Sequence, residues 1–128
     1  MQIRETFKAG EQGAIAMRFR AKGRQPTPPG QMNKLESKYA DHLALRLAAK
    51  EIQWFAYEPW KFRLADRTFF TPDFIVLTNE GFIEAHEVKG FWEDDARVKI
   101  KVANELHPVK FVAVRLVKKE WQFEEFPS

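Results

Sequence analysis

The spacing of apolar and polar residues divides the chain into a helix, a series of strands, a second helix and a last strand. Residues 33–50 are rich in helix formers, and positions 36, 39, 40, 43 and 47 fall on one side of a helix. Asn33 and Glu36 have the spacing of a capping box, so we expect the helix to begin there. Residues 94–107 predict a second helix, which Pro108 ends.

Short runs of aromatic and β-branched residues lie between the two helices, which is typical of strands. Extended segments are expected at residues 53–59, 60–64, 69–77 and 82–89, with a final strand at 109–117. The sequence TNEG, residues 78–81, is a hairpin signal. This order indicates an α/β domain with a central mixed β-sheet flanked by helices.

The N-terminal part of the chain has a different character. Residues 1–35 hold seven Lys or Arg and two acidic residues, whereas the remainder holds 14 basic and 16 acidic residues. Residues 14–20 alternate enough for a short strand, and residues 23–31 are rich in Pro and Gly. We predict a basic N-terminal arm with a Pro-rich linker over 1–32 and a folded domain over 33–128. Such an arm suggests contact with a polyanion, and a solvated tail is the alternative.

Composition narrows the protein class. The chain has 128 residues, of which 45% are hydrophobic and 30% charged, as in an ordinary soluble domain. It has no cysteine, which excludes disulfides and thiolate metal sites. No apolar run is long enough to span a bilayer, and the N-terminus lacks the apolar region of a signal peptide. We therefore expect a cytoplasmic protein without membrane contact.

Charged residues interrupt two of the predicted strands. Asp73 opens the run TPDFIVL, and Glu87 and Lys89 lie in EVKG. Because side chains alternate along a strand, Glu87 and Lys89 share one face while His86 and Val88 point to the other.

A particular hairpin register would bring these charges together. If Asp73 lies opposite Glu87, then Ile75 faces Ala85 and Leu77 faces Ile83, with the loop centred near residue 80. A slip of one residue would turn Asp73 to the wrong face.

Two adjacent carboxylates repel each other, and a hard divalent cation removes that repulsion. Lys89 beside such a cation could orient or deprotonate the attacking water, or neutralise charge in the transition state. This combination suits metal-assisted hydrolysis of a phosphodiester. Glu36, on the apolar side of the first helix, is a candidate third carboxylate, with a purely capping role as the alternative.

With these residues in this order, the chain resembles the PD-(D/E)xK nuclease superfamily, and most closely the phage endonuclease I family of Holliday-junction resolvases. In that family, TPDF is followed by a hairpin, an E-x-K-G strand and an aromatic, acidic and basic stretch. Here EVKGFWEDDARVKIKVANELHP stands in the corresponding place, and the similarity covers roughly residues 35–114.

The resemblance implies a restriction-endonuclease-like core and a Mg²⁺-dependent endodeoxyribonuclease, with Mn²⁺ able to substitute. It implies that Glu36, Asp73 and Glu87 bind one or two ions together with the backbone carbonyl of Val88, and that Lys89 is the catalytic lysine. It further implies branched DNA as the substrate, 5′-phosphate products, a homodimer, and a phage or bacterial role in DNA recombination inside the host cell. The family's dimers share a strand bridge, which the N-terminal arm of this chain does not visibly match.

Basic residues outside the catalytic set are expected to hold the DNA backbone. They lie in the arm, at the start of the first helix and in the second helix, together with one aromatic residue after EVKG: Arg18, Arg20, Lys22, Arg24, Lys34, Trp92, Arg97, Lys99 and Lys101. A solvated helix face is the alternative for the last three. Three further functions stay open: a non-catalytic DNA-binding module, a nicking or flap nuclease without junction selectivity, and a hydrolase of small phosphate esters.

Overall fold

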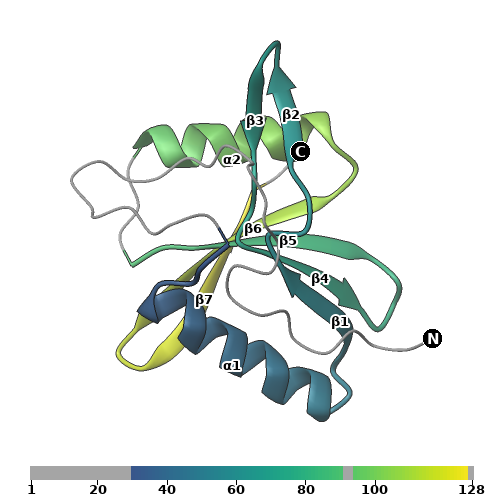
Figure 1. The fold of residues 1–128 in the computed structure, drawn as a ribbon, viewed down its shortest axis with the longest axis vertical. Helices are drawn as coiled ribbons and strands as arrows, with labels where there is room; N and C mark the ends of the chain where they lie inside the picture. Colours follow the sequence, from purple (N-terminus) through teal and green to yellow (C-terminus); the bar gives the residue numbers. More distant parts are fainter. Residues whose placement is uncertain (1–29, 91–93, 127–128) are drawn as a thin grey trace.

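A five-stranded β-sheet lies between two helices in the computed structural model, which describes residues 30–90 and 94–126. Figure 1 shows helix α1 (Lys34–Ala48) on one side of the sheet and helix α2 (Asp94–Leu106) on the other. The predicted arm and linker lie outside the described residues, except for residues 30–32.

The strands form two separate sheets. The main sheet has the order β1-β4-β5-β6-β7, and the small one pairs β2 with β3. Their bounds are β1 Ile52–Tyr57, β2 Phe62–Ala65, β3 Thr68–Phe70, β4 Phe74–Thr78, β5 Ile83–Val88, β6 Lys110–Val117 and β7 Glu120–Glu125. In the main sheet β5 and β6 run parallel, and the other neighbours run antiparallel. The prediction of an α/β domain with a mixed sheet flanked by helices is confirmed.

Helix α1 begins where the capping residues stand in the sequence. The side chain of Asn33 accepts a hydrogen bond from the N–H of Glu36 at 2.8 Å, and the Glu36 side chain accepts one from the N–H of Asn33 at 3.1 Å. This reciprocal pair satisfies two backbone donors that the first turn leaves without partners. The predicted capping box is therefore confirmed.

The two faces of the sheet bury different sets of side chains. Tyr39 and Leu43 of α1 pack on a cluster that includes Phe74, Val76 and Val88. On the other face, Ile100 and Ala103 of α2 pack on a cluster that includes Ile75, Ala85, Phe111 and Ala113. Even-numbered residues of β4, β5 and β6 thus face α1, and odd-numbered residues face α2, as the alternation of a strand requires.

The β4–β5 hairpin has the predicted register. Ile75 pairs with Ala85, and Leu77 pairs with Ile83. Gly81 closes the turn with φ +91°, which is a conformation that suits glycine because it has no Cβ.

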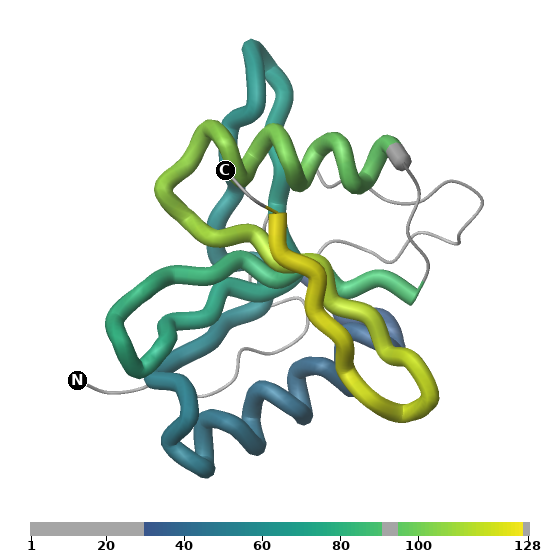
Figure 2. The backbone as a smooth tube through the Cα atoms, turned by 180° about the vertical axis from the view of Figure 1, so that it is seen from behind, coloured from purple at the N-terminus to yellow at the C-terminus, as the bar shows by residue number. Residues whose placement is uncertain are grey.

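Two parts of the strand prediction need correction. The run 69–77 is broken into β3 and β4, because Pro72 has no N–H with which to continue a ladder. The sequence reading also missed β7, which pairs with β6 from Val117 opposite Glu120 to Val112 opposite Glu125. Figures 1 and 2 show the turn between β6 and β7 coming down beside α1, where the ring of Trp121 lies 4.9 Å from that of Tyr39.

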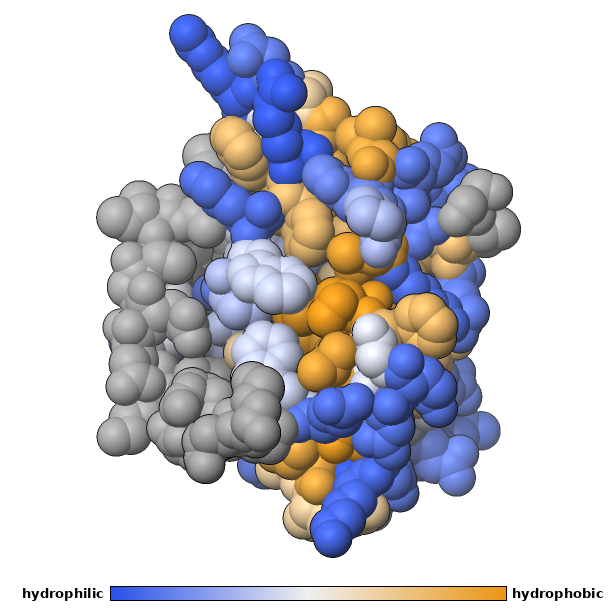
Figure 3. Space-filling view, turned by 90° about the vertical axis from the view of Figure 1, so that its right-hand side faces the viewer, coloured by the Kyte–Doolittle hydropathy of each residue, from blue (hydrophilic) through white to orange (hydrophobic). Residues whose placement is uncertain are grey.

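The surface is only partly polar. In Figure 3 apolar side chains form a band across the middle of one side of the molecule, with hydrophilic residues on both sides of the band. Neither helix of the described region is long and apolar enough to cross a membrane.

Candidate active site

Asp73 and Glu87 meet at one end of the β4–β5 hairpin. The N–H of Asp73 donates to Oε1 of Glu87 at 2.9 Å, and the N–H of Val88 donates to Oδ2 of Asp73 at 2.8 Å. Asp73 is 0% exposed and Glu87 3% exposed. Each carboxylate thus has one oxygen bound to a backbone donor of the neighbouring strand, which holds the two groups side by side.

Lys89 completes this group. Its Nζ lies 3.5 Å from Oε2 of Glu87, and the side chain is buried. The N–H of Lys89 donates to the carbonyl of Val114 in β6 at 2.9 Å, which continues the β5–β6 ladder beyond Val88. The structure therefore brings together three of the four predicted catalytic residues on the α2 face, namely Asp73, Glu87 and Lys89.

Glu36 reaches this region from the other side of the sheet. Its Oε1 accepts hydrogen bonds from the hydroxyl of Tyr57 at 2.9 Å and from the N–H of Asn33. Helix α1, which carries it, packs on the face opposite to Glu87. The first turn of α1 nevertheless lies beside the end of β5, since a side chain at Gly90 would touch Leu35. Glu36 thus approaches the end of β5 from the α1 side, whereas Asp73, Glu87 and Lys89 lie on the α2 face.

The donor set of this site suits a hydrated magnesium ion. Within residues 30–90 and 94–126, no three acidic or histidine side chains gather closely enough to hold a metal ion by themselves. Mg²⁺ commonly uses only one or two carboxylates, because it keeps several waters and takes further oxygens from substrate phosphates. Asp73 and Glu87 fit that pattern, whereas a ligand role for Glu36 stays a prediction.

Glu58 is an acidic residue of this region that the sequence reading missed. It follows β1 and is 4% exposed, and its N–H donates to the carbonyl of Asp73 at 2.8 Å. Its backbone is left-handed, with φ +49°, a conformation that costs an L-residue about 1–2 kcal/mol. Only its position gave a signal, as a carboxylate directly before Pro59 at the end of an apolar strand.

Glu58 is buried, unlike the other described non-glycine residues with a left-handed backbone. Among the described residues, the remaining non-glycine positions with positive φ are Lys50, Arg67, Lys118 and Lys119. All four are exposed, as is usual for turns, whereas Glu58 is buried next to Asp73. Buried backbone strain of this kind is typical of functional sites.

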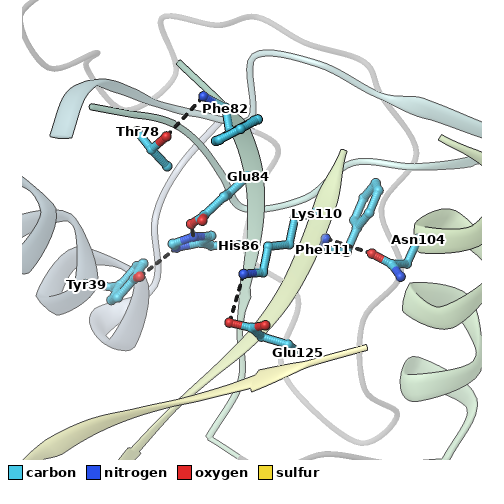
Figure 4. Close-up of polar contacts among 9 residues, drawn as sticks. All are labelled: Tyr39, Thr78, Phe82, Glu84, His86, Asn104, Lys110, Phe111 and Glu125. Carbon is cyan, nitrogen blue, oxygen red and sulfur yellow. Dashed lines mark hydrogen bonds and ion pairs between the residues drawn. The ribbon is translucent and has the colours of Figure 1, made fainter. Parts of the chain in front are cut away.

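His86 faces away from the site, as predicted. Its Nδ1 lies 2.6 Å from the hydroxyl of Tyr39 in α1, and its Nε2 lies 2.9 Å from Oε1 of Glu84. Figure 4 shows this chain of contacts linking α1 to β5, with the Lys110–Glu125 ion pair beyond it. The residue directly before Glu87 is thus held by the helix that carries Glu36.

Burial and hydrogen bonding shift the pKa values of Tyr39, His86 and Glu84. Burial lowers the pKa of His86, which keeps the imidazole neutral, and the hydrogen bond to Glu84 only partly opposes that effect. The same hydrogen bond lowers the pKa of Glu84, so its carboxylate stays ionised. Burial raises the pKa of Tyr39, which keeps the phenol protonated. A protonated phenol and an ionised carboxylate on either side of a neutral imidazole satisfy both ring nitrogens.

A cavity of about 390 Å³ opens on the α1 face and not at the candidate site. Its lining includes His42, Arg46, Glu84, His86 and Phe123. Because Asp73, Glu87 and Lys89 face α2, this cavity has no part in the chemistry considered for them.

The predicted DNA-binding residues have mixed positions. Lys34 and Lys101 are exposed, and Lys99 lies 4.0 Å from Asp95 in the same helix. Arg97 is paired with Glu124 of β7, with Nη1 lying 2.6 Å from Oε1. The other five predicted residues lie outside the described residues, and they are Arg18, Arg20, Lys22, Arg24 and Trp92.

Comparison of the chain with protein families, with curated proteins and with solved structures finds no match.

Proposed function

We propose that the protein is a metal-dependent endodeoxyribonuclease with a restriction-endonuclease-like core. The observation that carries the proposal is the meeting of buried Asp73, Glu87 and Lys89 at the end of the β4–β5 hairpin. Two carboxylates with a lysine beside them, in the order of the PD-(D/E)xK motif, suit metal-assisted phosphodiester hydrolysis.

Each residue has a separate task in this proposal. Asp73, Glu87 and the carbonyl of Val88 would hold a divalent cation, Mg²⁺ or Mn²⁺. Such a cation, when bound, would neutralise charge on the phosphate and make a water more acidic. Lys89 would place its ammonium group beside the reacting phosphate, where it stabilises the charge that develops. The hydrogen bonds from Asp73 and Val88 would keep both carboxylates oriented before substrate arrives.

The finer parts of the proposal rest on the sequence resemblance. They are branched DNA such as a Holliday junction as the preferred substrate, 5′-phosphate products, a homodimer, and a role in DNA recombination in a phage-infected or bacterial cytoplasm. The basic N-terminal arm supports contact with nucleic acid because it concentrates positive charge.

A non-catalytic DNA-binding module is the second candidate. It is favoured by one observation, namely that only two acidic side chains of the proposed ligand set lie side by side, while Glu36 is held by Tyr57 and Asn33. A binding module needs no metal, so the two candidates differ in their requirement for a cation.

The test is cleavage of supercoiled plasmid and of a synthetic four-way junction, with Mg²⁺ or with EDTA. We expect cleavage with Mg²⁺ only, and its loss in Asp73→Asn and Glu87→Gln, while both variants still bind the junction. Glu80→Gln is the matched control, because Glu80 is exposed in the hairpin turn. Cleavage that persists in Asp73→Asn would reject the catalytic assignment, and binding without any cleavage by the parent protein would favour the second candidate.

A further inference from the structure

Strand β6 places Arg115 beside the candidate site. Ala113 is the register partner of Glu87, and the N–H of Lys89 donates to the carbonyl of Val114. In a parallel ladder that bond puts the next residue, Arg115, beside Lys89. Register partners lie on one face of a sheet, so the side chains of Lys89 and Arg115 both belong to the α2 face.

Strand β7 extends the same two rows of residues. Glu124 pairs with Ala113, and Gln122 pairs with Arg115. One row therefore runs from Glu87 through Ala113 to Glu124, and the next runs from Lys89 through Arg115 to Gln122. Neighbouring strands lie about 4.8 Å apart, so both rows start at the catalytic residues and end within about 10 Å of them.

A small cavity lies over these rows. It has a volume of about 100 Å³ and is lined by Arg97, Ala113, Arg115, Gln122, Phe123 and Glu124. Arg97 comes from α2 and Arg115 from the sheet, so two guanidinium groups reach the cavity from different elements. Ala113, between Glu87 and Glu124 in the first row, lines the cavity with a small side chain.

Arg97 is already bound to an anionic group in this structure. Its Nη1 contacts both carboxylate oxygens of Glu124. A carboxylate and a phosphate present similar pairs of oxygens to a guanidinium group, so Glu124 occupies the position that a phosphate would take. Arg115 is exposed, and within residues 30–90 and 94–126 no carboxylate forms a salt bridge with it.

We propose that Arg97, Arg115 and Gln122 form a subsite for a backbone phosphate of DNA, and that Glu124 holds Arg97 there until the phosphate replaces it. The inference rests on the proposed function, because it takes the phosphate next to the one cleaved between Asp73, Glu87 and Lys89. The subsite reads no base, so it contributes affinity and position rather than sequence preference.

Neutralising one or the other member of the Arg97–Glu124 ion pair should change DNA affinity in opposite directions. DNA binding is measured in EDTA, without cleavage, on a four-way junction and on plain duplex at several salt concentrations. Arg115→Gln and Arg97→Gln are each expected to weaken binding by about tenfold and to reduce the slope of log K against log salt by about 0.9. Glu124→Gln is expected to tighten binding severalfold, because it releases Arg97. Placing Glu124→Gln in the Arg97→Gln background should abolish that gain.

Matched controls separate a local effect from a change of net charge. Arg63→Gln removes an exposed arginine on β2, and Glu120→Gln removes an exposed carboxylate at the start of β7. The subsite is rejected if Arg115→Gln behaves like Arg63→Gln, or if Glu124→Gln binds no more tightly than Glu120→Gln. Circular dichroism and melting temperatures establish that all variants are folded.

These binding measurements, together with the plasmid cleavage assay, distinguish this inference from the proposed function. A parent protein that cleaves plasmid while the subsite variants match their controls keeps the nuclease proposal and overturns the subsite. Variants that behave as expected in a parent without metal-dependent cleavage keep the subsite and overturn the nuclease proposal. A parent that neither cleaves plasmid with Mg²⁺ nor binds DNA overturns both.

Discussion

Asp73 and Glu87 are joined by a hydrogen bond of 2.9 Å from the backbone N–H of Asp73 to Oε1 of Glu87. The N–H of Val88 returns the contact to Oδ2 of Asp73 at 2.8 Å. The two carboxylates therefore lie together because each accepts a hydrogen bond from a backbone donor of the partner strand. The backbone of the hairpin thus positions both carboxylates.

Because the N–H of Val88 donates to Asp73, substitutions of Asp73 should differ in their effect on stability. Asp73→Ala leaves a buried N–H without an acceptor, so we expect it to lower the free energy of unfolding by about 1–3 kcal/mol. Asp73→Asn keeps an acceptor oxygen and should stay closer to the parent in stability. Both variants should lose cleavage. Urea unfolding of the two variants gives the comparison, and equal stability of Asp73→Ala and the parent would contradict the role given to the Val88 bond.

Lys89 offsets the buried charge of Glu87. Lys89→Met removes one partner of a buried pair, so we expect a loss of about 3–5 kcal/mol in the free energy of unfolding, together with loss of cleavage. Adding Mg²⁺ should recover part of that stability if the site binds the ion. Glu87→Gln in the Lys89→Met background should also recover part of the stability, because it removes one of the two buried carboxylate charges. Lys38→Ala, on the exposed side of α1, is the control.

The imidazole of His86 predicts a dependence of stability on pH. Its pKa lies below the ordinary value of 6.5 mainly because the ring is buried. The positive charges of Arg46 and Lys110 lower the pKa further, and Glu84 only partly opposes these effects. The unfolded chain therefore binds this proton more tightly than the folded one. The stability from the neutral imidazole is fully present above pH 6.5 and is lost as the pH falls below it.

Melting temperatures between pH 7.5 and pH 5 test this effect. The parent should melt at lower temperature as the medium becomes more acidic, and His86→Gln should show a shallower dependence. His107→Gln, at the end of α2, should keep the dependence of the parent. A parallel dependence in His86→Gln and the parent would remove His86 as its cause.

Glu58 should matter more for activity than for stability. Glycine adopts φ +49° without strain, so in Glu58→Gly the relief of backbone strain offsets part of the cost of deleting a buried side chain, and we expect the free energy of unfolding to change by no more than about 1 kcal/mol. Cleavage should fall, because the carboxylate next to Asp73 is lost. Arg67→Gly makes the same backbone change at an exposed turn and should keep full cleavage. Equal cleavage by the two variants would make Glu58 a structural residue only.

Local patterns were sufficient for the parts of the site that lie close in sequence. The two-residue period of 73–77 and 83–89 and the length of the loop between them determine which side chains share a face, so the register and the orientation of His86 could be predicted. The capping box is likewise a contact between residues three positions apart.

Contacts between distant segments could not be predicted in this way. Glu58 comes next to Asp73 only through the pairing of β1 with β4, and Arg115 comes next to Lys89 only through the parallel pairing of β5 with β6. Strand β7 was missed because EWQFEE has four polar residues, which is typical of an edge strand. Its alternating Trp121 and Phe123 were the available signal.

The antiparallel hairpin that carries Asp73, Glu87 and Lys89 has a consequence for the order of assembly. Its contacts are short in sequence, so closing it costs little loop entropy, whereas pairing β6 with β5 must close the longer segment that contains α2. We therefore expect Asp73 and Glu87 to come together early in folding, and Arg115 of β6 to take its place beside Lys89 later. Substitution of Ala85 should slow refolding, while substitution of Val114 should mainly speed unfolding, as stopped-flow kinetics would measure.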